Sequence, residues 1–146
     1  MGNALLTMLA DRMVRETPQA VALGIELVSV DPAAAVMKVG YRADLVGDPQ
    51  TGVLAGGVIT TLLDHVCGLA VTGRNGGGSA TLDLRIDYMR SAEPGRDVIA
   101  RANCYKLTRT VAFVRAIAYE DSLEDPIATA QGAFVLAGAP PASPSK

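Results

Sequence analysis

Residues 52–71 read GVLAGGVITTLLDHVCGLAV, and this stretch predicts one helix that is buried on nearly every side. The apolar side chains from Val58 to Val71 cover almost the whole circumference of a helix instead of a single stripe. The glycines at 76–78 then end the pattern. Because such a helix must be surrounded by protein, we expect a helix over about 57–72 at the centre of the fold.

Two polar residues, Asp64 and His65, interrupt this apolar helix. An ionised carboxylate is costly in apolar surroundings unless something compensates it, so Asp64 either reaches solvent or has a function. Adjacent helical residues point about 100° apart, so the two side chains cannot form a facing pair. We therefore take Asp64 as the candidate functional residue and interpret His65, the only histidine, as structural.

The rest of the chain predicts an α+β fold in which an antiparallel β-sheet wraps around one long central helix. Amphipathic spacing indicates a first helix over about 4–16, and 42–52 has no period and is expected to be loop. Strands joined by short turns are predicted over 22–30, 33–41, 80–90, 97–108, 111–120 and 126–138. One helix cannot cover both faces of a sheet, so the other face is expected to meet another subunit or the first helix.

The chain length of 146 residues matches one domain, which we place over residues 1–138. Residues 139–146 are rich in proline and serine and are expected to be disordered. A composition of 49% apolar and 19% charged residues is typical of a folded globular protein.

Charge and cysteine patterns argue against several classes of function. The net charge is −2 and the 13 Lys and Arg residues are scattered, so no nucleic-acid partner is expected. The N-terminus lacks the features of a signal peptide, and no apolar run approaches the roughly 20 residues that span a bilayer. A cytoplasmic location without a membrane partner is therefore expected. Cys67 and Cys104 lie in apolar segments without CxxC spacing, so we expect core thiols and no metal site.

Gly56 and Gly57 stand immediately before the central helix. The first N–H groups of a helix have no intrahelical partner, and glycines there let a carbonyl or an oxyanion approach the backbone closely. Alternatively, the pair merely allows a sharp turn. Asp64 lies seven residues after Gly57, two turns and roughly 10 Å further along nearly the same face. It could act there as general base or nucleophile if a partner chain supplies the other wall of a cleft, or simply protrude into solvent.

The strand over 80–90 alternates, with one face apolar and the other polar. We place Thr81 on the polar face, together with Asp83, Arg85 and Asp87, and a solvated face is the simplest interpretation. Three arginines are candidates for phosphate recognition because guanidinium groups suit that task, namely Arg90, Arg109 and Arg115.

Taken together, TGVLAGGVITTLLDHVCG (51–68) and ATLDLRIDYMRSAEPG (80–95) resemble the hotdog-fold acyl-CoA thioesterases of the PaaI-like type, in the 4-hydroxybenzoyl-CoA thioesterase superfamily. The signature of that family places Gly-x-x-His-Gly-Gly at the start of the central helix and an acidic residue seven positions after the second glycine. A T-x-D-x-x-x-x-Tyr strand follows. The resemblance extends over about 22–137 and implies a hotdog fold.

The resemblance also implies roles for single residues. Asp64 matches the catalytic acid, and Gly56 matches the glycine whose N–H polarises the thioester carbonyl. Thr81 matches a residue that helps to position the attacking water, and Gly57 and Gly52 match as well. The family further implies an acyl-CoA substrate, no cofactor beyond the coenzyme A of that substrate, and a homodimer that is often paired into a tetramer.

The sequence departs from the family pattern at two positions. Ala55 replaces the histidine before the two glycines, and Pro49 replaces an asparagine for which Asp48 or Gln50 could substitute. We therefore expect an acyl-CoA thioesterase of weakened or altered activity, or alternatively a non-catalytic acyl-CoA-binding protein. A hydratase ranks last, because His65 faces away from the matched acid. The expected substrate-binding residues are Gly57, Ala55, Gln50, Arg90 and Arg109.

Overall fold

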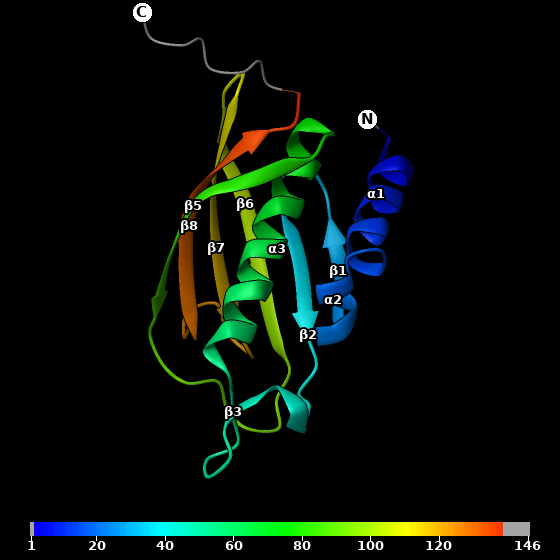
Figure 1. Ribbon diagram of the computed structural model, residues 1–146. Coiled ribbons are helices and arrows are strands. Elements are labelled where there is room, and N and C mark those ends of the chain that lie inside the picture. The colour runs from blue at the N-terminus through cyan, green and yellow to red at the C-terminus, as the bar shows by residue number, and fades with distance from the viewer. Residues whose placement is uncertain (1, 139–146) are drawn as a thin grey trace, which may run out of the picture.

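The computed structural model describes residues 2–138, so the predicted disordered tail at 139–146 lies outside the described residues. At its centre lies the helix α3 (Gly56–Asn75), and a six-stranded sheet of strand order β1-β2-β6-β7-β8-β5 curves around it (Figure 1). All paired strands are antiparallel. The predicted α+β architecture with one long central helix is confirmed.

The strands of the sheet agree closely with the predicted segments. Their bounds are β1 (Ile25–Val30), β2 (Ala35–Val39), β5 (Ser79–Tyr88), β6 (Val98–Leu107), β7 (Val111–Tyr119) and β8 (Ala128–Leu136). Strand β5 follows α3 in the chain and forms one edge of the sheet, beside β8. The chain therefore leaves the end of α3 and runs back beside this helix as the edge strand β5.

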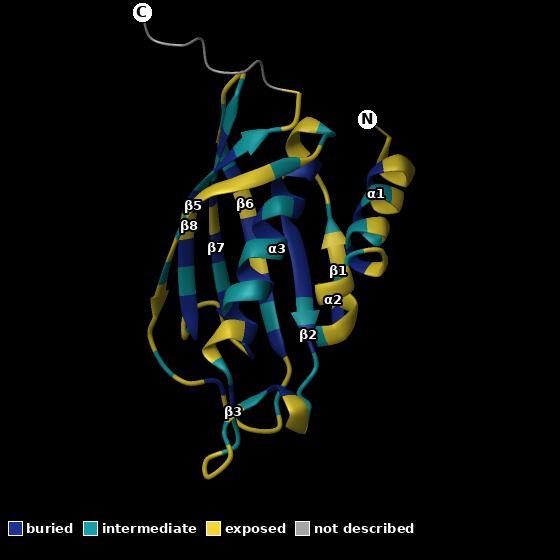
Figure 2. Cartoon of the chain, viewed as in Figure 1, coloured by how far each residue is buried: buried dark blue, intermediate teal, exposed yellow. Residues whose placement is uncertain are grey.

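The core lies between α3 and the concave face of the sheet (Figure 2). The fully buried side chains of α3 are Leu62, Leu63, Val66, Cys67, Leu69 and Val71. The facing strands bury mainly alanines, namely Ala100, Ala102, Ala112, Ala116, Ala118, Ala128 and Ala130. Small side chains on the sheet leave room for the large ones of the helix, and each fully buried Leu or Val contributes about 1.5–3 kcal/mol to folding.

The two cysteines belong to this interior. Cys67 and Cys104 are both free and buried, which confirms the prediction of core thiols. Burial, and to a smaller extent the charge of Asp64, raises the pKa of the Cys67 thiol. Burial also raises the pKa of Cys104. Both side chains therefore stay protonated at neutral pH.

By length and composition α3 could cross a membrane, since it has 20 residues and contains an apolar window of 18 residues with a mean hydropathy of 1.2. The expectation that no apolar run approaches that length is therefore wrong. Within the fold, however, 61% of that apolar window is buried by the rest of the chain. This is the environment of a core helix, because the sheet covers the surface that lipid would otherwise contact.

Two segments differ from the sequence prediction. Helix α2 (Pro18–Leu23) occupies the start of the predicted strand 22–30, because Pro18 favours a helix start and Gly24, at φ 68°, ends the helix in the left-handed conformation. The predicted loop 42–52 contains short elements, which are η1 (Ala43–Leu45), β3 (Val46–Asp48) and, just beyond it, β4 (Val53–Leu54). These short elements lead the chain into the start of α3.

Helix α1 (Asn3–Arg15) packs on the same side of the sheet as α3 (Figure 1). It buries Leu6, Ala10 and Val14, one residue per turn, against the rest of the fold. The expectation that this first helix could cover the other face of the sheet is therefore wrong. The convex face stays uncovered by the described residues.

Candidate active site

The start of α3 presents open backbone donors. Ala55 is the N-cap, in extended conformation, and no side chain of residues 2–138 caps the helix. The Val58 N–H donates to the Ala55 carbonyl at 3.0 Å. The N–H groups of Gly56 and Gly57 have no acceptor within residues 2–138. These two N–H groups, at the positive end of the helix dipole, can therefore receive an oxygen of a ligand.

The backbone of this chain does not itself require glycine at either position. Neither Gly56 nor Gly57 has a positive φ. A Cβ added at Gly57 would meet nothing within 4 Å, and one added at Gly56 would meet only Tyr88 Cε1, at an ordinary contact distance of 3.8 Å. The alternative that the pair merely permits a sharp turn is therefore not supported. What the missing side chains do provide is open space beside two unpaired donors.

Asp64 is half-buried and turned toward strand β5. There the Thr81 hydroxyl donates a hydrogen bond to Asp64 Oδ1 at 2.7 Å. This bond limits the rotation of the side chain, and the second carboxylate oxygen has no hydrogen-bond partner among residues 2–138. The structure thus brings together two of the residues that the sequence assigned to the site.

Thr81 reaches Asp64 because strand β5 contains a β-bulge. Thr81 pairs with Phe134 and Asp83 pairs with Ala133, so Leu82 is an extra residue. The bulge breaks the alternation of the strand and places Thr81 on the same face as Leu84, which packs against the core. The prediction that Thr81 shares a face with Asp83 and Arg85 is therefore wrong.

His65 points away from Asp64, as the helical spacing predicted. Its Nε2 lies 2.9 Å from the carbonyl oxygen of Met13 in α1. This contact ties α1 to α3, which supports the structural interpretation of His65.

Tyr88 and Thr60 contact the glycine pair, although the sequence assigned no role to either. The Tyr88 hydroxyl donates to the Gly56 carbonyl at 3.2 Å, and the Thr60 hydroxyl donates to the same oxygen at 3.1 Å. The only signal in the sequence was the position of Tyr88 in the strand motif. Nothing in that motif shows which group the Tyr88 hydroxyl would reach.

A pocket of about 330 Å³ adjoins the start of α3 and includes Arg90. Its lining residues are Leu54, Gly56, Ile59, Tyr88, Met89, Arg90, Ser91, Ala92 and Ile127. Arg90 binds the buried Glu120 at 2.7 Å and the exposed Asp125 at 3.2 Å. Burial opposes the charge on Glu120, but hydrogen bonds from Arg90 and from the Glu93 N–H lower its pKa overall. The Arg90 guanidinium is therefore already engaged by two carboxylates at the edge of this pocket.

The remaining predicted binding residues lie at different distances from the helix start. Ala55 packs closely against Gly47. A Cβ added to Gly47 would lie only 2.8 Å from the Cα of Ala55. Gln50 is exposed in the turn between β3 and β4, with its N–H bonded to Asp48 Oδ1 at 3.0 Å. Arg109 lies at the tip of the β6–β7 hairpin, at the opposite end of the sheet from Gly56 (Figure 1). A single chain therefore does not bring Arg109 to the start of α3.

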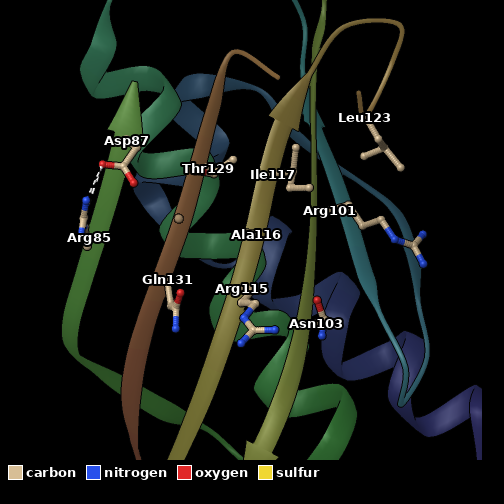
Figure 3. Close-up of a pocket in the computed structure, with 11 residues that line it drawn as sticks. Arg85, Asp87, Arg101, Asn103, Arg115, Ala116, Ile117, Leu123, Thr129 and Gln131 are labelled. Atoms are coloured by element: carbon tan, nitrogen blue, oxygen red, sulfur yellow. Dashed lines mark hydrogen bonds and ion pairs between the residues drawn. The ribbon is translucent and has the colours of Figure 1, made fainter. Parts of the chain in front are cut away.

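A second pocket, of about 490 Å³, lies on the convex face of the sheet (Figure 3). Arg115 lies here, with its guanidinium stacked 3.9 Å from the centre of the Tyr105 ring. The sheet separates this pocket from α3, so Arg115 and Asp64 do not share a site. Within residues 2–138, no group of three or more His, Cys, Asp or Glu side chains is arranged to hold a metal ion.

Comparison with known proteins agrees with these features. The family model of the thioesterase superfamily matches residues 51–126, which include Gly56, Asp64 and Thr81. Human acyl-coenzyme A thioesterase 13 is 29% identical over 90 residues, which cover 61% of this chain and 63% of that protein. The chain thus spans less than two thirds of the length of this curated relative.

Solved structures give the same assignment over more of the chain. A protein from Pseudomonas aeruginosa is 38% identical, with a TM-score of 0.81, over 89% of this chain and 98% of that one. A mutant of the phenylacetic acid degradation protein PaaI from Thermus thermophilus is 29% identical, with a TM-score of 0.72, over 82% of this chain and 98% of that one. Together with the family match over more than half of its length, this similarity shows that the chain belongs to the thioesterase superfamily, as a PaaI-like protein with the hotdog fold.

Proposed function

We propose that the protein hydrolyses acyl-CoA thioesters, with Asp64 as general base or nucleophile and the Gly56 N–H as oxyanion donor. The observation that carries this proposal is the Thr81–Asp64 hydrogen bond of 2.7 Å. It fixes a carboxylate on the same helix that begins with the Gly56 and Gly57 N–H groups, which have no acceptor within the described residues. Human acyl-coenzyme A thioesterase 13, one of the relatives, acts on acyl-coenzyme A by its name, which supports this substrate class. No metal or cofactor takes part in the proposed reaction.

In the general-base form, Asp64 accepts a proton from a water molecule whose oxygen attacks the thioester carbonyl. The negative charge moves to the carbonyl oxygen, where the Gly56 N–H stabilises it. Collapse of the tetrahedral intermediate breaks the C–S bond, and the proton returns to the coenzyme A thiolate. In the nucleophilic form, Asp64 itself attacks the carbonyl carbon, the C–S bond breaks to expel the coenzyme A thiolate, and water then hydrolyses the resulting anhydride to the free acid and the Asp64 carboxylate. Thr81 orients the carboxylate in both forms.

A second copy of the chain completes this site. Gly56 and Asp64 are eight residues apart in one helix, about 12 Å along its axis, whereas both groups must lie roughly 3 Å from the reacting atoms. A homodimer with α3 helices running side by side in opposite directions would place Asp64 of one chain opposite Gly56 of its partner. Strand β5 supports this assembly, because it is an edge strand with exposed apolar side chains at Leu82, Tyr88 and, just after it, Met89. Two such dimers form the proposed tetramer.

A thiol-release assay with short, long and aromatic acyl-CoAs tests the activity. We expect release from at least one class, and a fall of about 100- to 10,000-fold in kcat for Asp64→Asn, because that change removes the proton acceptor. Asp83→Asn is the matched control, since Asp83 lies on the same strand as Thr81 but faces away from α3. Undiminished activity in Asp64→Asn contradicts the mechanism.

A single turnover in ¹⁸O-labelled water separates the two roles of Asp64. With enzyme in excess of substrate, a general base leaves the label only in the released acid. In the nucleophilic form, attack of water on the Asp64 carbonyl carbon of the anhydride places the label in the Asp64 carboxylate, where peptide mass spectrometry detects it.

Ala55 favours a second candidate function, a protein that binds acyl-CoA without hydrolysing it. The family histidine is missing at the N-cap of α3, where Ala55 offers no polar side chain. Saturable binding of an acyl-CoA together with no thiol release in the same preparation would support this second function over the first.

A further inference from the structure

The glycine pair at the start of α3 is conformationally free, whereas the oxyanion donor proposed there must have a fixed direction. Glycine has more conformational freedom than any other residue, so two in succession at a helix end favour fraying. An oxyanion donor, by contrast, stabilises a transition state only if its direction is fixed in advance. Something other than the glycines themselves must therefore hold this turn.

Three consecutive carbonyl groups in the turn are held by hydrogen-bond donors. The Ala55 carbonyl accepts from the Val58 N–H at 3.0 Å. The Gly56 carbonyl accepts from the Thr60 hydroxyl at 3.1 Å, and the Gly57 carbonyl accepts from the Thr61 hydroxyl at 2.9 Å. Because a peptide group is planar, fixing a carbonyl also fixes the N–H of the next residue. The Ala55 carbonyl thus orients the Gly56 N–H, the Gly56 carbonyl orients the Gly57 N–H, and the Gly57 carbonyl orients the Val58 N–H, while the N–H groups of both glycines stay open within the described residues.

Tyr88 adds an anchor from outside the helix. Its hydroxyl lies 3.2 Å from the Gly56 carbonyl oxygen and also contacts the Thr60 hydroxyl; because each hydroxyl has one proton, at least one of the two donates to this carbonyl and the other donates to it or to the first hydroxyl. Tyr88 is 52% exposed as a residue, so the hydroxyl could point to solvent, yet it bonds to the turn. A threonine that bonds four residues back is common in helices, but a tyrosine from a neighbouring strand on the same oxygen is not part of that local pattern.

We infer that Thr60, Thr61 and Tyr88 are positioning residues of the glycine turn of α3. Thr60 and Tyr88 hold the peptide that carries the Gly57 N–H and Thr61 holds the following peptide, so together they keep the adjoining Gly56 N–H in the orientation needed for an oxyanion donor. This inference rests on the proposed function. The three side chains act through the backbone of Gly56 and Gly57 and form no bond with the reacting atoms in this arrangement. Strand β5 thereby fixes both parts of the site, Asp64 through Thr81 and the glycine turn through Tyr88.

Steady-state kinetics of matched variants test the inference. Thr60→Val and Tyr88→Phe remove only hydroxyl groups, and we expect each to lower kcat about 3- to 30-fold with KM changed less than about 2-fold, because the donor loses its alignment. Thr60→Ser should restore most of the loss. The double variant should lose less than the product of the two single effects, since both hydroxyls bond to one oxygen. Thr7→Val is the control, because Thr7 makes the same bond to the Asn3 carbonyl, at 2.9 Å, in α1.

Backbone ¹⁵N relaxation provides a readout that does not depend on activity. We expect lower order parameters at Gly56 and Gly57 in Thr60→Val and Tyr88→Phe than in wild type, and no change there in Thr7→Val. Unchanged order parameters in both site variants overturn the inference, as does a lower melting temperature with unchanged kcat. If wild type releases no thiol from any acyl-CoA, the proposed function fails, while the relaxation data still decide whether these side chains hold the turn.

Discussion

At the scale of single residues, the site depends on polar groups without a hydrogen-bond partner in the described residues and on a position without a side chain. Gly56 lacks a side chain, and its N–H lacks a partner within the described residues. Asp64 has one carboxylate oxygen bonded to Thr81 and one without a partner in the part of the chain that the structure describes. These unpaired groups are the ones that a substrate can contact, because the buried polar groups of a fold are almost always paired.

Replacing Gly56 by proline tests the backbone donor directly. Proline is favoured at the first position of a helix, and Ala55, at φ −60° and ψ 139°, already has the conformation that precedes proline. The substitution therefore removes the N–H with little cost in stability, and kcat should fall about 100- to 1,000-fold. Gly56→Ala keeps the N–H and fits the space beside Tyr88. Equal activities of the proline and alanine variants in the thiol-release assay would contradict the donor role.

At the scale of elements, the β-bulge in β5 determines which residues meet α3. The sequence predicted α3 with Asp64 on it and the succession of strands along the chain, because buried helices and alternating strands have periodic apolar patterns. It did not predict the bulge. Apolar and polar residues continue to alternate along the sequence around Leu82, whereas the side chains there no longer alternate between the two faces of the strand. The contacts of Thr81 and Tyr88 depend on tertiary structure and could not be read from spacing alone.

Gly132 in β8 makes room for this bulge. An added Cβ would collide with the Asp83 carbonyl oxygen and come within 3.1 Å of Leu84 Cα. We expect Gly132→Ala to lower the free energy of unfolding by about 1–3 kcal/mol and also to lower kcat, because β5 must shift and Thr81 with it. Urea unfolding and the thiol-release assay measure the two effects. The control is Gly78→Ala, whose Cβ would meet Ala137 at an ordinary 3.8 Å. If both alanine variants behave alike, the bulge does not position Thr81.

At the scale of the whole molecule, stability and assembly can be separated. The interior is closed by α3 and α1 on the concave side of the sheet, so the chain folds around its own core. The proposed active site, by contrast, needs a second copy, because Gly56 and Asp64 of one chain lie too far apart. A folded but inactive monomer is therefore the expected product of any change that prevents dimer formation.

Stability should depend on pH through Glu120. Its pKa is lowered in the folded state, so its contribution is complete above the ordinary glutamate pKa of about 4.3 and is lost as the pH falls through the lower folded value. Glu120→Gln should cost on the order of 2 kcal/mol at pH 7, and the difference from wild type should shrink below pH 4. Asp125→Asn, which changes the exposed partner of the same arginine, should have little effect. Urea unfolding at several pH values checks this, and a difference that grows on acidification would contradict it.

Mixing two inactive variants tests the shared site. A hybrid dimer of Asp64→Asn and Gly56→Pro chains has one site with both substitutions and one with neither. Random exchange of subunits should therefore recover about a quarter of the wild-type activity. A site formed within one chain would recover none, and light scattering of the mixture confirms that the dimers persist.

Because its two thiols are buried, the native protein should add almost no background signal to the thiol-release assay. Cys67 and Cys104 are enclosed by the core, and burial raises the pKa of both, so neither presents a thiolate to a reagent in solution. A disulfide reagent should therefore give almost no colour with the native protein and react with both cysteines after denaturation. In the native state every thiol it counts will have come from coenzyme A, so even a slow turnover, such as Ala55 leads us to expect, can be measured at high enzyme concentration.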